Sequence, residues 1–130
     1  KLIYYDIFMI NPYKNKTGLT RILSAFKNSA YGLKNTFKNE EAFRQELILT
    51  IILTPLAIYI GENHIERIFL ITSLILLLLV ELINTAIEVT VDRVSYKKNE
   101  LSKLAKDIGS AAVLIAFLNC FIVWFFILFS

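Results

Sequence analysis

The stretch from Arg67 to Arg93, RIFLITSLILLLLVELINTAIEVTVDR, decides the fold class of this chain. Its first half, residues 68–80, has no charged residue and is rich in Ile, Leu and Phe, a composition typical of a helix surrounded by lipid. Its second half is interrupted by three acidic residues and an asparagine: Glu81, Asn84, Glu88 and Asp92. We therefore predict a membrane-spanning helix over about 67–91 with acidic groups near one end.

Two further apolar stretches flank this one. Residues 47–61 have no charge, and residues 108–129 are 22 positions without a charge. At about 1.5 Å per residue the second of these is long enough to cross roughly 30 Å of hydrocarbon. We predict membrane helices over about 42–60 and 108–129. The chain is 56% hydrophobic with a mean hydropathy of +0.59, and this excess lies in long blocks, which argues against an ordinary water-soluble domain.

The residues before the first span have a different pattern. Between about 19 and 38, apolar residues recur at the helical period and lysines face away from them, which predicts an amphipathic helix in the plane of the membrane surface. Residues 1–16 are expected to be a peripheral or disordered segment rather than a signal peptide, because Asp6 interrupts their apolar run. The fold class predicted is all-α: a surface helix and three membrane helices, with residues 17–130 forming a single domain.

Charge asymmetry predicts the orientation of the chain. Residues 1–46 hold eight Lys or Arg against four acids, residues 92–107 hold five against three, and the link 61–67 holds one against two. Because basic segments stay in the cytoplasm, we expect a cytoplasmic N-terminus and a C-terminus on the other side. The net charge of +3 suggests contact with anionic lipid and leaves no soluble basic face for nucleic acid.

The polar residues of the second span share one helix face. At 100° per residue, Glu81, Asn84, Glu88 and Asp92 fall within about 80° of each other. An ionisable group at membrane depth costs about 2.5–3.5 kcal/mol or more, so these side chains should face protein, water or a cation. The alternative, that they only join helices through polar contacts, is strongest for Asp92, which lies at the end of the span.

Two more polar clusters are predicted at the same, cytoplasmic face: NEEAFRQE at 39–46 and AKDIGS at 105–110. Carboxylate oxygens from two helices, completed by water and phosphate, suit Mg²⁺, and Lys106 is suited to hold a phosphate as a point charge. Neither a Walker-type phosphate loop nor the glycine loop of protein kinases occurs. From these patterns alone the chain is either a membrane enzyme or part of an ion pathway.

Four segments together resemble the prokaryotic diacylglycerol kinase family: TGLTRI at 17–22, NEEAFRQE at 39–46, ELINTAIE at 81–88 and AKDIGSAA at 105–112. The resemblance runs from about Thr17 to the end of the chain, and the ELINTAIE segment is its most specific part. It implies a homotrimeric kinase of the bacterial inner membrane. That enzyme would transfer the γ-phosphate of MgATP to diacylglycerol and give phosphatidic acid.

The resemblance also implies roles for residues of this sequence. Glu81 matches the general base, Glu40 and Glu88 match the carboxylates that bind Mg²⁺, and Asn84 and Asp92 match supporting residues. The residues implied at the ATP site are Arg21, Asn28, Glu40, Glu88, Lys97, Lys98, Asn99, Lys106 and Asp107. The residues implied at the lipid site are Arg21, Phe43, Arg44, Gln45, Glu46, Glu81, Ser110 and Trp124, the last also placed where an interface anchor would lie.

Three alternatives stay open at this point. An undecaprenol kinase would share the same site residues, although the details at 44–46, 91–93 and 109–110 look more like the diacylglycerol branch. A proton- or cation-coupled transporter subunit would need polar groups along the whole depth of the membrane, whereas 68–80 offers only Thr72 and Ser73. The third alternative is a membrane subunit with a purely structural role.

Overall fold

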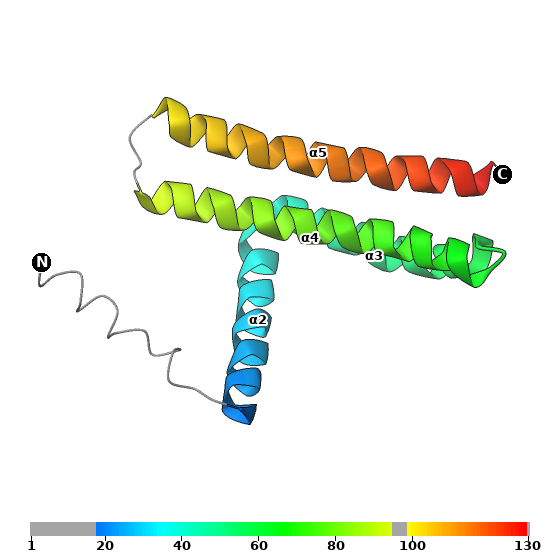
Figure 1. Cartoon of the computed structure of the whole chain (residues 1–130), viewed down its shortest axis with the longest axis horizontal. Helices are drawn as coiled ribbons and strands as arrows, with labels where there is room; N and C mark the ends of the chain where they lie inside the picture. The colour runs from blue at the N-terminus through cyan, green and yellow to red at the C-terminus, as the bar shows by residue number, and fades with distance from the viewer. Residues whose placement is uncertain (1–17, 95–98, 130) are drawn as a thin grey trace, which may run out of the picture. The chain divides into compact units, whose positions relative to one another are not determined.

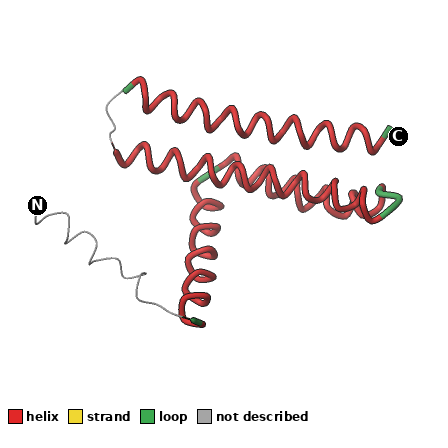
Figure 2. Tube along the Cα trace, viewed as in Figure 1, coloured by secondary structure: helices red, strands yellow, loops and turns green. Residues whose placement is uncertain are grey.

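The computed structural model describes residues 18–94 and 99–129. Within these ranges the regular structure consists of four helices and no strand (Figures 1 and 2). Their bounds are α2 (Leu19–Asn39), α3 (Glu41–Ile60), α4 (His64–Val94) and α5 (Glu100–Leu128). The segment predicted at 1–16, together with Lys97 and Lys98, lies outside the described residues.

The chain divides into two compact units, with the boundary between Asn35 and Thr36 inside α2. In α2 the predicted amphipathic helix is present, and no residue of it is buried. Leu19 is 78% exposed and Phe26 is 72% exposed. Such large apolar side chains need a covering that residues 18–94 and 99–129 do not supply, which agrees with the predicted position at a lipid surface.

In the second unit, α4 is the central helix and packs against both α3 and α5 (Figure 1). Its buried face begins with Leu70, Leu74 and Leu77, which are at most 1% exposed, and continues with Glu81 and Asn84. These positions recur every three or four residues, the spacing that keeps side chains on one face of a helix. The apolar core of the bundle therefore passes directly into a buried polar cluster along a single helix.

Three helices, α3, α4 and α5, are long and apolar enough to cross a membrane. The outward faces of α3 and α5 are apolar and exposed, as in Ile51 (63%) and Ile115 (67%). In water such surfaces would drive association, whereas in lipid they are solvated. The predicted fold class, an all-α membrane protein with a preceding amphipathic helix, is confirmed.

The helices are longer than the predicted membrane spans. The spans predicted at about 67–91 and 108–129 leave the polar segment between them outside any helix, but α4 continues to Val94 and α5 begins at Glu100. The Asn99 Oδ1 atom accepts hydrogen bonds from the backbone N–H of Leu101 (2.9 Å) and Ser102 (3.3 Å). This N-cap satisfies amides that would otherwise lack partners, so the helix starts two turns before its apolar part.

Candidate active site

The acidic face of α4 points into the bundle. Glu81 is 5% exposed and Asn84 is 9% exposed, while Glu88 and Asp92 are half-buried. Each lies three or four residues from the next along the same face that buries Leu74 and Leu77. The packing of that apolar stripe against α3 and α5 therefore forces the carboxylate of Glu81 inward.

The first turns of α3 bring two more carboxylates to Glu81. Glu46 is 8% exposed, and the charge of Glu81 acts directly on it. The carboxylates of Glu88 and of Glu40, the residue that precedes α3, both repel the negative charge of Glu81. Glu40, Glu46 and Glu88 thus each interact electrostatically with Glu81, and a bound cation would relieve the repulsion among these carboxylates.

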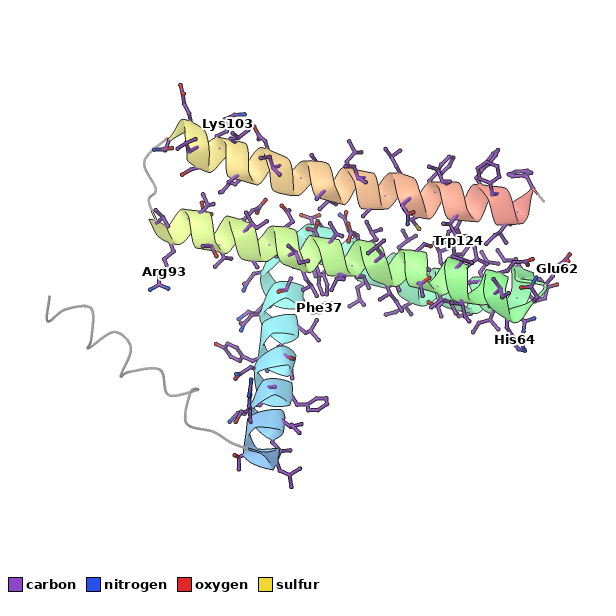
Figure 3. All side chains as sticks on the ribbon, in the orientation of Figure 1. Phe37, Glu62, His64, Arg93, Lys103 and Trp124 are labelled. Atoms are coloured by element: carbon purple, nitrogen blue, oxygen red, sulfur yellow. The ribbon has the colours of Figure 1, made fainter. Side chains whose placement is uncertain are left out.

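The start of α5 adds basic groups beside this cluster. The Lys106 Nζ atom lies 2.6 Å from Asp92 Oδ1, and its charge also acts on Glu88. One turn earlier, Lys103 Nζ lies 2.5 Å from Asp107 Oδ2, in an exposed pair within α5. Figure 3 shows Arg93 and Lys103 at the same end of the α4–α5 pair. This end of the helix pair therefore carries lysines next to carboxylates. Lysines can bind phosphate groups and carboxylates can bind a divalent cation, so both parts of a metal–phosphate complex would find suitable partners here.

The side chain of Asn84 lies between α4 and α5, where it approaches Gly109 of α5 closely. Its Nδ2 atom is 3.5 Å from Glu88 Oε1, a long hydrogen bond, and its Oδ1 atom is buried with no hydrogen-bond partner among the described residues. A Cβ atom built on Gly109 would lie 2.3 Å from that Oδ1. The amide therefore occupies space that only a glycine at position 109 leaves open.

The structure also reveals a polar residue that the sequence reasoning missed. Thr50 lies one turn beyond Glu46 on α3. Within the described part of the chain, its Oγ1 atom is buried without a hydrogen-bond partner, as is Glu46 Oε2. The nearby Thr54 instead donates to the carbonyl oxygen of Thr50 (2.7 Å), the usual arrangement for a threonine in a helix. The spacing of four residues places Glu46 and Thr50 on the same face of α3. A single threonine in an apolar span does not, however, predict a functional site by itself.

Several residues predicted for the lipid site have structural contacts within the chain. Phe43 is 3% exposed and belongs to the core. Arg44 Nη1 donates to the carbonyl oxygens of Phe37 (3.2 Å) and Lys38 (3.1 Å), near the end of α2. Gln45 Nε2 donates to Glu41 Oε1 at 3.1 Å. These contacts fix the geometry of the chain just before and after Glu40.

Other predicted residues lie apart from Glu81 or outside its unit. Ser110 is exposed on α5 next to Gly109. Trp124 is opposite the first turns of α4, because Ser73 Oγ contacts Cys120 Sγ at 3.6 Å, and Figure 3 shows it toward the end that carries Glu62 and His64. At 1.5 Å per residue this is about 18 Å along the axis from Glu81. Arg21 and Asn28 are exposed on the part of α2 that belongs to the first unit.

The donor set suits magnesium bound together with phosphate. Among the described residues, no group of three His, Cys, Asp or Glu side chains is close enough to hold a metal ion unaided. Mg²⁺ is commonly held by one or two carboxylates, with waters and substrate phosphates completing its octahedron. Glu40 and Glu88, which both act on Glu81, fit that role, whereas they would be a poor site for a zinc ion.

Comparison with known proteins identifies the family. The model of the prokaryotic diacylglycerol kinase family matches residues 27–128. A diacylglycerol kinase of Haemophilus influenzae is 50% identical over 113 residues, covering 87% of this chain and 96% of that protein. Those of Pseudomonas aeruginosa and Escherichia coli K12 are 45% and 44% identical, covering 88% and 89% of this chain and 93% and 95% of the relatives. With matches of this extent, the chain belongs to the prokaryotic diacylglycerol kinase family.

Proposed function

We propose that the protein transfers the γ-phosphate of ATP, bound as its magnesium complex, to the free hydroxyl of 1,2-diacylglycerol, giving phosphatidic acid and ADP. The observation that carries this proposal is the position of Glu81, a buried carboxylate within reach of the charges of Glu40, Glu46 and Glu88. The family to which the chain belongs and the names of its relatives support the same reaction.

In this mechanism Glu81 is the general base. Its carboxylate accepts the proton of the lipid hydroxyl as the hydroxyl oxygen attacks the γ-phosphorus, and the bond from that phosphorus to the β–γ bridging oxygen breaks. Burial on the inner face of α4 keeps water from competing with the lipid as the acceptor. Glu46, a residue of α3 that interacts electrostatically with Glu81, is proposed to lie near the glycerol part of the lipid.

Glu40 and Glu88 are proposed to hold the magnesium ion of MgATP. When bound, the ion would neutralise phosphate charge and orient the γ-phosphoryl group. Lys106 is proposed to contact the phosphates, and Asp92 to hold the lysine in place through their 2.6 Å ion pair. Asp107, Asn99, Arg21, Asn28, Lys97 and Lys98 remain the other residues proposed to lie near ATP.

The proposed topology brings both substrates to one place. We infer that the N-terminus and the α4–α5 connection face the cytoplasm, that the C-terminus faces the periplasm, and that the membrane is the bacterial inner membrane. The lipid hydroxyl would then reach Glu81 at headgroup level while ATP enters from the cytoplasm. We further propose a homotrimer, in which neighbouring copies cover part of the exposed apolar faces of α3 and α5.

The test is phosphate transfer by the purified protein in detergent micelles. A short-chain diacylglycerol and a short polyprenol are supplied separately, each with Mg²⁺ and with chelator, and Glu81→Gln is the control. We expect Mg²⁺-dependent product on diacylglycerol that the variant does not form. Product on the polyprenol alone would keep the mechanism and replace the substrate, and a folded protein that transfers phosphate to neither would refute the kinase proposal.

A further inference from the structure

The contact between Gly109 and Asn84 orders the amide of Asn84. Only one of the two amide orientations is compatible with its neighbours, because the ionised carboxylate of Glu88 accepts hydrogen bonds and cannot donate them. The NH₂ group must therefore face Glu88, and it does so at 3.5 Å. The Oδ1 atom is then left on the side of Gly109, where it is buried and none of residues 18–94 and 99–129 forms a hydrogen bond with it.

Gly109 is itself buried, on the face of α5 that packs against α4. The ideal position of a Cβ atom, 2.3 Å from Oδ1, is also the direction of a glycine Cα hydrogen, which therefore points at the amide oxygen. Contacts of a Cα–H group with an oxygen recur at close helix–helix interfaces and are weakly favourable. The glycine thus provides the space for the amide, and its Cα–H group is directed at the amide oxygen.

We propose that Gly109 is a positioning residue of the magnesium site: it holds the Asn84 amide in the orientation that directs its NH₂ group to Glu88. Gly109 itself touches no substrate. It acts through Asn84, whose hydrogen bond orients the carboxylate that takes part in holding MgATP. This inference rests on the proposed role of Glu88 in binding magnesium.

The substitution Gly109→Ala is a selective test of this idea. The added methyl group would collide with Asn84 Oδ1, the far end of a flexible side chain, while the nearest backbone atom, Asn84 Cα, would lie at an ordinary 3.9 Å. The two helices therefore need not separate, and only the amide has to turn away. We expect the midpoint of thermal unfolding to change by no more than about 2 °C and the site geometry to change instead.

The measurement is the binding of Mn²⁺ with a non-hydrolysable ATP analogue, followed by electron paramagnetic resonance on the full chain in micelles. Losing a residue that orients a metal ligand commonly weakens metal affinity by about tenfold. We expect Gly109→Ala to raise the dissociation constant about threefold to tenfold. Ala116→Ser is the matched control, because it adds one atom to the same helix pair two turns away, at a residue that is 4% exposed; it should bind Mn²⁺ as the wild type does.

A double substitution separates positioning from general packing. Asn84→Ser removes the amide and should weaken Mn²⁺ binding by itself, and adding Gly109→Ala should then change the constant by less than twofold. Unchanged binding in Gly109→Ala, the same loss in both backgrounds, or a Gly109→Ala protein that does not fold would each overturn the inference. Wild-type kinase activity on diacylglycerol is measured in parallel, so that failure of the proposed function is seen separately.

Discussion

At the scale of single residues, the central feature is the concentration of like charge around Glu81. A carboxylate that is 5% exposed and has three acidic neighbours is unfavourable in the absence of a cation. Buried carboxylates with acidic neighbours are common in active sites, where the charge takes part in binding or catalysis. The stability of the protein and its proposed activity should therefore respond in opposite directions when this charge is removed.

The first prediction concerns Glu81→Gln. The amide has the shape of the carboxylate but cannot accept the lipid proton, so turnover should fall by about 10²–10⁴-fold. Without metal, the thermal unfolding midpoint should stay the same or rise, because one of the repelling charges is gone. Glu62→Gln, at an exposed position in the α3–α4 link, is the control and should alter neither quantity. Retained turnover in Glu81→Gln would exclude Glu81 as the base.

A second prediction separates Lys106 from its partner Asp92. If Lys106 binds phosphate, Lys106→Met should raise the KM for ATP at least about tenfold, since an interaction between charged groups is lost. Asp92→Asn should raise it only a few-fold, because the pair is half-exposed and such ion pairs contribute about 0–1 kcal/mol. Steady-state kinetics at saturating lipid measure both values. Equal effects of the two variants would indicate that the pair acts as a unit and that the lysine has no separate role.

At the scale of elements, the N-cap of α5 determines where the charged residues at the start of this helix lie. Its apolar part would suffice for a helix from Ile108 onward, yet the cap at Asn99 starts it at Glu100 and so puts Lys103, Lys106 and Asp107 on helical turns. The two ion pairs of this region both depend on that extension. The start of α5 before its apolar part thereby fixes the positions of these charged side chains relative to α4.

The third prediction tests this cap. Asn99→Ala should destabilise the start of α5 by about 0.5–2 kcal/mol, while Asn99→Asp keeps an acceptor for the amides of Leu101 and Ser102 and should be close to neutral. Hydrogen exchange of the first turns of α5 reports the loss locally. Asn99→Asp also isolates the role predicted for Asn99 near ATP: a KM for ATP that rises in this variant, with the cap intact, would support direct contact with the nucleotide.

At the scale of the whole molecule, the length of α4 constrains the topology. Its 31 residues extend for about 46 Å, more than the roughly 30 Å of hydrocarbon in a bilayer. His64 and Arg93, near its two ends, cannot both lie on the same side if α4 spans the membrane. Figure 3 shows these two side chains at opposite ends of the helix.

The fourth prediction uses this separation. In a Cys120→Ser background, His64→Cys should react with a membrane-impermeant thiol reagent added to intact spheroplasts, and Arg93→Cys should react only after the cells are broken. Mass spectrometry of the purified protein measures the labelling. The reverse pattern would invert the proposed orientation, and labelling of both positions in intact cells would contradict a spanning α4.

The number and the kind of the membrane helices could be predicted from the amino-acid sequence. Charge-free runs such as 68–80 and 108–129 have no favourable environment in water, so hydropathy alone identifies them. The common face of Glu81, Asn84 and Glu88 also followed from the sequence, because 3.6 residues per turn is a local property of the chain. The family was recognisable from short segments, and the comparisons confirm it.

Which helices supply the remaining groups of the candidate site depends on how the helices pack together, and this could not be predicted from the sequence. Interactions such as the ion pair of Lys106 with Asp92, the electrostatic influence of Glu81 on Glu46 and the close approach of Gly109 to Asn84 depend on the register between helices. Side-chain packing sets this register, and hydropathy does not encode it. The start of α5 at Glu100 was missed for a related reason: a cap is one hydrogen-bonding side chain, and its effect appears only when the backbone around it is folded. Local periodicity is a property of a segment, whereas an interhelical distance is a property of the packed bundle.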